Sequence, residues 1–413
     1  MTARSRRTTA TALLQAVSVT TTGVLPAFLV GALAVQIRED LDVGPAEIGL
    51  AAATLFTVAG ILARFLGRFV QRIGAGRGIA ISATLAALAL AGVSAAGSFA
   101  VLIAAMVVGG IANALAQPSA NLRISQAVDL QRLGLAFGIK QSSIPAATLL
   151  GGLAVPGIAL VVGWRWAFVA GAVAAAGIAV WAAVGRAGPR RLPGGGGAEV
   201  PADRGTPLGG LVVLTVAGGL AAATGTCLGV FLIDSAVRTG IPPSSAGLLF
   251  AAAALSGLLI RIALGAAMDR HPTSSPYLIM ANLLVGGCLG YLLLATGRPV
   301  LFALGALLAY AAGWTWTGLL HFAVVRDNRT GAAAATGVLQ TGLSFGSAAG
   351  PLLFGLLAEA TSYSTSWLAT AATALLAALT FRVGRRMIRR SRGLPVRALR
   401  SRNDHHVQTE ENR

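Results

Sequence analysis

Residues 67–72 read GRFVQR, and residues 265–270 read GAAMDR. Both segments begin with glycine and end with arginine, and they lie 198 residues apart (265 − 67). Each follows a long apolar stretch, so the two copies have the same setting in the chain. A motif that returns in the same setting after so many residues indicates that the chain contains an internal repeat.

Two further landmarks return at nearly the same distance. The pattern Arg-x-Gly at 132–134 reappears at 329–331, and Gln141 reappears as Gln340. These offsets are 197 (329 − 132) and 199 (340 − 141) residues. Because three separate landmarks agree within two residues, the second half of the chain is predicted to repeat the fold of the first.

The composition indicates that the repeated unit lies in a membrane. The 413 residues are 55% hydrophobic and only 11% charged, whereas a soluble domain carries about 25% charged residues. A spanning helix needs about 20 mostly apolar residues. The sequence predicts twelve such runs, at 12–35, 47–66, 78–96, 99–122, 134–161, 164–185, 209–235, 245–264, 276–296, 299–322, 332–358 and 364–383.

The arginines support an even number of spans. The N-terminus, the loops after even-numbered spans and the C-terminal stretch hold most of them, whereas the opposite loops hold about one each. Cytoplasmic loops are enriched in Lys and Arg, so both termini are predicted to be cytoplasmic. The formal charge of +18 is spread over loops and the tail and does not favour nucleic-acid binding.

A linker divides the spans into six and six. Residues 186–208 contain four prolines and the glycine run at 194–197, which is typical of a flexible connection. The predicted fold is an all-α membrane protein of two pseudo-symmetric six-helix bundles. Its expected domains are a first bundle at 1–185, a cytoplasmic linker at 186–208, a second bundle at 209–383 and a basic tail at 384–413.

Signatures of catalysis or of metal binding do not emerge from the sequence. Cys227 and Cys288 lie in apolar runs and are expected to be reduced packing residues. No nucleophile elbow, phosphate loop or zinc signature is present. The apolar stretch 13–35 is too long for the core of a signal peptide and is predicted to be the first span. We therefore expect no catalytic residue, no metal and no cofactor, and a protein that is not an enzyme.

The repeated motif resembles the loop after the second span in the major facilitator superfamily, Gly-x-Leu-Ala-Asp-Arg-x-Gly-Arg-Lys/Arg. The resemblance extends over nearly the whole chain and implies twelve helices, transport by alternating access, and a cavity lined by spans one, four, seven and ten. Gln71 replaces the acidic residue of the family motif, so the charge network that the motif implies lacks one member in the first half. The matching positions in the first copy are Gly67, Phe69, Gln71, Arg72, Gly74 and Arg77.

Polar residues on the spans indicate which helices line a path. Asn113, Gln117 and Asn121 are spaced four apart in span four and therefore share one helical face. Spans one and ten carry similar stripes that include Gln15 and Thr317. Hydrogen bonding between helices is the alternative interpretation of such residues.

The single lysine of the chain, Lys140, falls inside span five. If that span begins near residue 133, Lys140 lies about 10 Å into a hydrocarbon half-layer of about 15 Å. It is either a functional intramembrane charge or a side chain that reaches back to the interface. The sequence places it at the same depth as Gln117. Arg64 and Arg261 are expected to reach the interface, and Asp234 is expected to pair with Arg238.

A deep cation without a deep acid favours an anionic or strongly dipolar solute and disfavours proton coupling through a carboxylate. His321 could titrate near neutral pH, although a hydrogen bond to a neighbour is its commoner role. The hypothesis is a secondary transporter of a small solute in the cytoplasmic membrane, working as a monomer with an undetermined coupling ion. A drug or metabolite exporter and a non-transporting sensor are the alternatives. The predicted solute-binding residues are Lys140, Gln141, Asn113, Gln117, Gln15, Trp314, Thr317 and Gln340, and the predicted gating residues are Gly67, Arg72, Asp269 and Arg270.

Overall fold

The computed structural model describes residues 3–128, 133–184, 206–270, 275–328 and 332–391. Within these ranges, twelve helical segments are long and apolar enough to cross a membrane, as the sequence predicts. The elements are α1 (Ala3–Ala32), α2 (Ala34–Leu41), α3 (Pro45–Ile73), α4 (Ala75–Ser94), α5 (Phe99–Ser125), α6 (Leu133–Gln141), α7 (Ser143–Ala154), η2 (Val155–Ala159), α8 (Leu160–Val162), α9 (Trp164–Val184), α10 (Leu208–Arg238), α11 (Pro243–Arg270), α12 (Pro276–Ala295), α13 (Pro299–Leu308), η3 (Ala309–Gly313), α14 (Thr317–Asp327), α15 (Ala332–Ala360) and α16 (Tyr363–Ser391).

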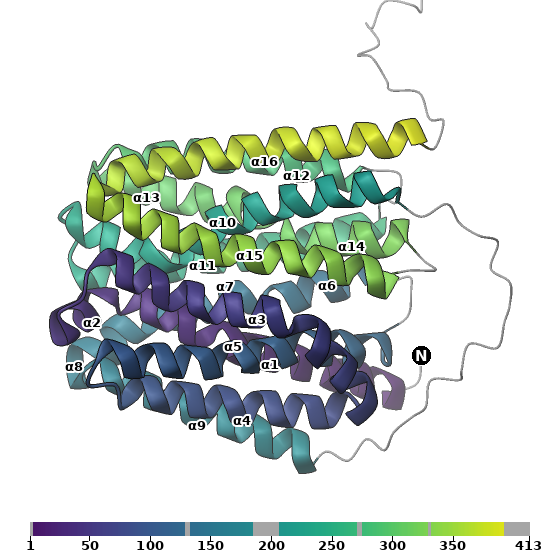
Figure 1. The fold of residues 1–413 in the computed structure, drawn as a ribbon, viewed down its shortest axis with the longest axis horizontal. Coiled ribbons are helices and arrows are strands. Elements are labelled where there is room, and N and C mark those ends of the chain that lie inside the picture. The colour runs from purple at the N-terminus through teal and green to yellow at the C-terminus, as the bar shows by residue number, and fades with distance from the viewer. Residues whose placement is uncertain (1–2, 129–132, 185–205, 271–274, 329–331, 392–413) are drawn as a thin grey trace, which may run out of the picture.

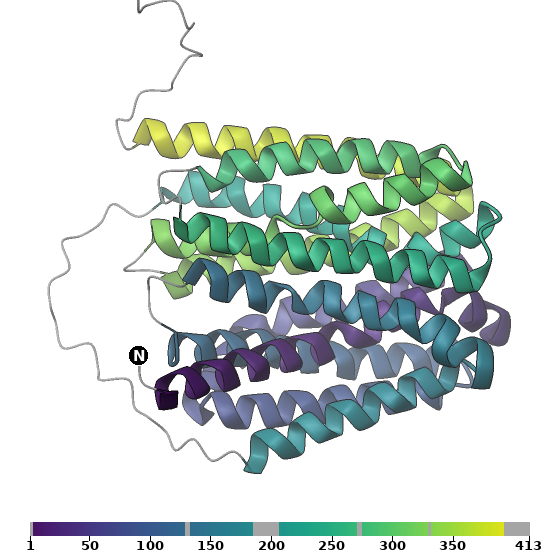
Figure 2. The same cartoon turned by 180° about the vertical axis from the view of Figure 1, so that it is seen from behind.

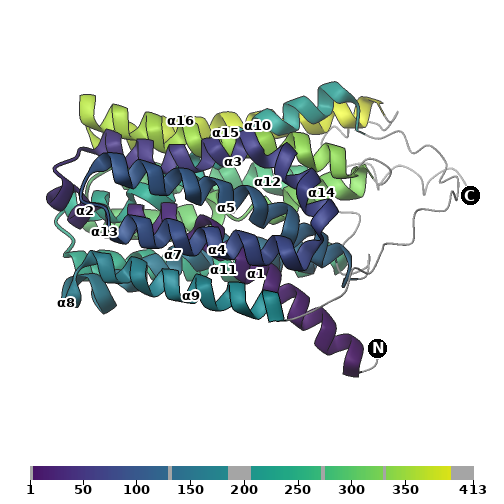
Figure 3. The same ribbon diagram turned by 60° about the horizontal axis from the view of Figure 1, so that its bottom comes forward.

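The spans form one long bundle in which the first six and the last six lie in separate groups. Figure 1 shows α1 to α9 in purple and blue below α10 to α16 in teal to yellow, and Figure 2 shows the same division from behind. The beginning of α1 and the end of α16 lie at the same end of the bundle (Figure 3). We call this the terminal end, and the opposite end the loop end.

Two features at the helix ends differ from the prediction. The short helix α2 follows α1 directly at the loop end, and α16 continues to Ser391 instead of ending at residue 383. The extension is held by α10, because a Cβ atom on Gly384 would lie 3.0 Å from Leu214. The rest of the predicted tail, residues 392–413, and most of the predicted linker lie outside the described residues.

Span five is not one helix over 134–161. The structure divides it into α6, α7, the π-helix η2 and α8. Two prolines cause this division, because proline has no N–H for the carbonyl four residues before it and its ring crowds that carbonyl. Pro145 follows the junction of α6 and α7, and Pro156 lies in η2. The break next to Pro145 is the one that matters for the site.

Span ten is divided as well. Helix α13 passes into the π-helix η3, and α14 begins only at Thr317. Between them Trp314 leaves the helical conformation, with φ −118° and ψ 4°. A π-turn holds one more residue than an α-turn and is often found at functional sites. Both divided spans therefore leave main-chain groups without helical partners near the middle of the bundle.

Glycine contacts join the two groups of spans closely at the loop end. A Cβ atom on Gly31 would lie 2.5 Å from Val230 Cα, and one on Gly152 would lie 2.6 Å from Gly247 O. On α3, a Cβ atom on Gly49 would overlap the Pro351 carbonyl. These positions need glycine because the facing backbones are in contact.

Towards the terminal end, α3 and α15 separate. A Cβ atom on Gly60 would lie 2.9 Å from Ser344 Cβ, whereas one on Gly67 or on Gly337 would meet no described atom within 4 Å. In contrast, α6 and α11 stay in contact, because a Cβ atom on Gly138 would lie 2.9 Å from Arg261 O. The loop end is thus closed where α1 meets α10, where α7 meets α11 and where α3 meets α15. At the terminal end α6 and α11 stay in contact, whereas α3 and α15 do not.

We predict that Gly49→Ala lowers the thermal stability of the purified protein. The added methyl group must move α3 or α15, and overpacking of this kind costs about 1–3 kcal/mol. Gly337→Ala is the matched control on α15, since its methyl group meets open space and alanine favours a helix by about 1 kcal/mol over glycine. Differential scanning fluorimetry should show a lower midpoint for the first variant only, and equal midpoints would contradict the close packing.

Candidate functional site

Lys140 lies near the middle of the bundle with its side chain fully buried. Its Nζ atom donates a hydrogen bond to Gln117 Oε1 of α5 over 2.5 Å. The interpretation in which this lysine reaches back to the interface is therefore wrong, because the side chain turns towards α5. The two residues lie at the same depth, as their distances from the loop between their spans predict.

Gln141, the next residue, faces the second half. Its Nε2 atom lies 2.9 Å from Nδ1 of His321 on α14, and the same ring nitrogen lies 2.9 Å from the Thr317 carbonyl. Gln340 of α15 lies close to the His321 side chain, and its Nε2 atom lies 3.5 Å from Ser344 Oγ on its own helix. The predicted residues Gln141, Thr317 and Gln340 thus gather around a histidine that the sequence left as a minor candidate.

Arg261 does not reach the interface, in contrast to the prediction. It is 3% exposed, and it lies nine residues before the end of α11 at Arg270, which is about 13 Å at 1.5 Å per residue. Its guanidinium donates to the Gln141 carbonyl over 2.6 Å and also to the Trp314 carbonyl. The prediction that Arg261 reaches the interface failed because α11 points this side chain into the protein, where the carbonyls of Gln141 and Trp314 accept its hydrogen bonds.

Lys140 and Arg261 give the centre two buried cations from opposite halves. The described residues include two buried acidic side chains, Asp234 and Asp327. Asp327 ends α14 and accepts a hydrogen bond from Tyr277 over 2.8 Å, and Asp234 belongs to a separate cluster at the loop end. Neither neutralises the central cations, so the centre is electrostatically suited to an anion.

Trp314 forms an apolar wall next to these groups. It is 3% exposed, and its ring lies edge-on to Phe28 of α1 at 5.5 Å between centroids. The Tyr310 ring lies 5.5 Å from the Trp314 ring between centroids, and a Cβ atom on Gly225 would overlap the indole. The tryptophan therefore fills the space between α1 and α10 and fixes where the Trp314 carbonyl points.

The remaining predicted binding residues lie around this centre in different ways. Asn113 is buried on α5, and its Oδ1 atom has no hydrogen-bond partner. Gln15 accepts a hydrogen bond from Arg123 over 2.8 Å, so it bonds a residue near the terminal end and not Lys140. The structure thus groups Lys140, Gln117, Gln141, Thr317, Trp314 and Gln340 closely, and leaves Gln15 apart.

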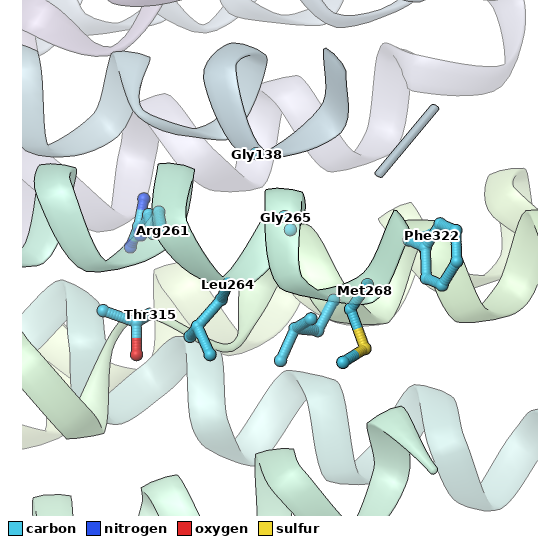
Figure 4. Close-up of a pocket in the computed structure, with 9 residues that line it drawn as sticks. Gly138, Arg261, Leu264, Gly265, Met268, Thr315 and Phe322 are labelled. Atoms are coloured by element: carbon cyan, nitrogen blue, oxygen red, sulfur yellow. The ribbon is translucent and has the colours of Figure 1, made fainter. Parts of the chain in front are cut away.

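The predicted gating residues are not brought together. Arg72 and Arg270 are exposed, and Gly67 faces open space. The side chain of Asp269 lies outside the described part of the chain. Nearby, Figure 4 shows Gly138 of α6 opposite Gly265 of α11, where a Cβ atom on Gly138 would lie 3.4 Å from Gly265 Cα. A crevice too narrow to admit a water molecule lies beside Arg261 and is lined by Gly138 and Gly265.

The loop end carries an ion cluster that joins the halves. Asp234 of α10 pairs with Arg38 of α2 at 3.1 Å, and it pairs with Arg238 at 3.7 Å. Tyr363 of α16 donates a hydrogen bond to the same carboxylate, and Arg238 stacks over the Tyr363 ring at 4.6 Å. The predicted pair with Arg238 is present, but the shorter ion pair is the one that crosses between the halves.

A helix start strengthens this closure. The backbone N–H of Ala46, in the first turn of α3, donates to Glu359 Oε2 of α15 over 3.2 Å. An acid at a helix N-terminus is favoured by the free N–H groups and the helix dipole. The partners Arg38 and Glu359 could not be assigned from the sequence because they lie far along the chain from Asp234 and Ala46, although both are charged residues close to predicted span ends.

Comparisons with known proteins agree with this architecture. The family model described as Major Facilitator Superfamily matches residues 8–213 and 213–403. No curated protein matches the chain significantly in sequence.

Two similar solved structures are of a bacterial homolog to the human lysosomal transporter Spinster. The inward-facing, unoccupied form has a TM-score of 0.70 and 17% identity, covering 93% of this chain and 98% of that one. The inward-facing, occupied form has a TM-score of 0.69 and 17% identity, with coverages of 92% and 97%. Because the family model matches most of the sequence and the fold agrees, the chain belongs to the Major Facilitator Superfamily and is a membrane transporter of that fold.

Proposed function

We propose that the protein transports a small organic anion by alternating access, with the solute bound between Lys140 and Arg261. The observation that carries the proposal is the pair of buried cations that come from opposite halves and have no acidic partner at their depth. A buried charge without a counter-ion is costly. A solute carboxylate or phosphate would supply the missing charge, and it would contact both halves at once.

The neighbouring residues suit the rest of such a solute. Gln117, Gln141 and Gln340 offer amides, and Thr317 offers a hydroxyl whose Oγ1 atom has no hydrogen-bond partner. Trp314 offers a flat apolar surface. A few oriented polar groups next to an aromatic wall are typical of small-molecule sites. Asn113, with its unpaired Oδ1 atom, and Gln15 remain proposed at the margin of the site.

The proposed orientation is supported by the positions of the arginines. We place the terminal end in the cytoplasm, because the loops at that end are the basic ones and basic loops stay inside. The closed loop end then faces the outside of the cytoplasmic membrane. With the loop end closed by backbone contacts and by the ion pair of Asp234 with Arg38, we propose that this state is shut off from the outside.

The two bundles, residues 1–185 and 209–383, are the proposed moving units, connected by the linker 186–208 and followed by the tail 384–413. Gly67, Arg72, Asp269 and Arg270 stay proposed as gating residues that would meet when the terminal end closes. The protein is proposed to act as a monomer and without catalytic activity.

The proposal is tested by a solute panel on purified protein. Small mono- and dicarboxylates, phosphate esters, tetraalkylammonium ions and sugars are compared by thermal shift, since a ligand at 100 times its dissociation constant stabilises the folded state by about 2.7 kcal/mol. Solutes that stabilise the protein are then tested for counterflow in proteoliposomes. We expect both signals for anions only. Counterflow of an organic cation, or stabilisation by sugars alone, would reject the anion proposal.

A further inference from the structure

Pro145 leaves one main-chain carbonyl of span five without its helical donor. In a regular helix the N–H of residue 145 would bond the carbonyl of Gln141, but proline has no N–H. A buried carbonyl without a partner costs free energy. The neighbouring Lys140 carbonyl receives the hydroxyl of Ser143 from the same span. The carbonyl of Gln141 finds its donor elsewhere.

That donor is Arg261, which belongs to the other half of the protein. Its NH1 group bonds the Gln141 carbonyl over 2.6 Å, and its NH2 group bonds the Trp314 carbonyl at the end of η3. One planar guanidinium thus occupies the ends of two interrupted helices. Helix C-terminal ends carry partial negative charge and favour a cation, and the fixed fork of arginine suits two acceptors at once.

The surroundings place this contact where the halves touch. Helices α6 and α11 are in backbone contact at Gly138, so the arginine can reach the Gln141 carbonyl only while these helices stay together. The guanidinium also lies 5.7 Å from the centre of the Trp314 ring. Its Nε atom has no hydrogen-bond partner, so the two carbonyls account for the hydrogen bonds of the side chain in this state.

We propose that Arg261 is a positioning residue that clamps the two halves together on the terminal side of the centre, by holding the Gln141 carbonyl that Pro145 leaves unpaired. The clamp exists only while α6 and α11 are in contact, and it must open before the terminal end can open fully. Pro145 is the other part of the clamp, because it leaves the Gln141 carbonyl without a donor from its own helix. The inference adds a conformational role to the proposed anion site, but it does not depend on which solute is bound.

The clamp is tested by the distance between the halves, measured without any solute. Spin labels are placed on two exposed terminal-end positions, Gln126 directly after α5 and Val338 of α15. The background carries alanine at Cys227 and Cys288. Pulsed electron–electron double resonance then measures the distribution of distances between the two labels in nanodiscs. We expect Arg261→Gln to raise the ratio of the longer to the shorter distance by at least about tenfold, since glutamine cannot bond both carbonyls and the loss of one charge-assisted hydrogen bond already has that effect.

Pro145→Ala provides the specific control. Alanine restores the N–H that bonds the Gln141 carbonyl within the helix, so the carbonyl no longer requires the arginine. We expect Pro145→Ala alone to lengthen the distance modestly, and Arg261→Gln to add little in the Pro145→Ala background. Such non-additivity is the sign of a shared interaction, and a residue that only supports folding would not show it.

Three results would overturn the clamp. The first is an unchanged distance distribution in the folded Arg261→Gln variant. The second is a double variant in which the effects of the two substitutions simply add. The third applies if Arg261→Gln does not fold, and it is an unchanged distance distribution in Pro145→Ala. If the first of these results came with a rise in KM for an anion, Arg261 would act only on the solute. If the unsubstituted protein did not transport anions but the variants showed the expected distance changes, the proposed solute would be rejected and the clamp would stand.

Discussion

Lys140→Met is expected to abolish anion uptake into proteoliposomes. Lys140 is the buried cation of the first half, and an ion pair at 4 Å is worth about 4 kcal/mol at an effective dielectric constant of 20. That energy corresponds to a loss of about a thousandfold in the affinity for an anion. Initial uptake rates over a range of solute concentrations give KM and the maximal rate, and we expect no saturable component in the variant.

The same substitution is expected to raise the thermal stability of the protein. Methionine has a similar volume but no charge to desolvate, whereas Lys140 is fully buried and bonded to the neutral Gln117. Functional residues often lower stability in this way. If Lys140 served only to hold α5 and α6 together, the variant would lose stability together with activity. A higher midpoint with lost uptake therefore separates the two roles.

Arg64→Met is the matched control for the lysine. Arg64 also lies within a predicted span, but it is exposed on α3 and is expected to leave the uptake of an anion unchanged. Lys140→Arg keeps the charge with a larger, planar head group and should retain part of the activity. Normal uptake by Lys140→Met, or equal losses in Arg64→Met and Lys140→Met, would contradict a role for Lys140 in binding the solute.

The number and order of the spans could be predicted because both depend on local composition. About 20 apolar residues make a span in any context, and basic loops mark its ends. The breaks in spans five and ten could not be predicted in the same way. Pro145 and Pro156 are visible in the sequence, but membrane helices accept prolines when neighbours supply the missing donors. Whether Arg261 is such a donor depends on which helix lies against α6.

The candidate site was only partly predictable for the same reason. Lys140 and Gln117 could be placed at one depth by counting residues from their common loop. Arg261 was expected at the interface because only its distance from the end of the span was considered. Its actual environment depends on the rotation of α11, and a span with apolar residues around its whole circumference leaves that rotation unspecified.

Contacts between residues far apart in the chain were the second feature that could not be predicted from the sequence. The pair of Asp234 with Arg238 follows from their spacing of one helical turn, whereas the pair with Arg38 joins residues 196 positions apart. A single sequence contains no signal that links such positions. The repeat places the six-helix units beside each other, but it does not specify which charged loop residues meet across them.

Asp234→Asn is expected to open the loop end. Asp234 is 3% exposed, forms ion pairs with Arg38 and Arg238, and accepts a hydrogen bond from Tyr363. The amide keeps the shape of the side chain but loses the charge, so two arginines face each other without an anion. Removing one partner of a buried ion pair costs about 3–5 kcal/mol. The partial exposure of Arg38 and Arg238 reduces the expected shift to about 2 kcal/mol, or about thirtyfold in population.

Spin labels on the exposed loop-end positions Ala100 and Thr361 would measure this shift. We expect Asp234→Asn to convert the short distance into a longer one and to lower the thermal midpoint. Asp40→Asn is the matched control, since its ion pair with Arg165 at 2.6 Å lies within the first half and both side chains are about 40% exposed. Exposed pairs contribute about 0–1 kcal/mol, so this variant should keep the short distance. If both variants kept it, the backbone contacts at glycines such as Gly49 would be sufficient to close the loop end, and the ion cluster would not be the gate.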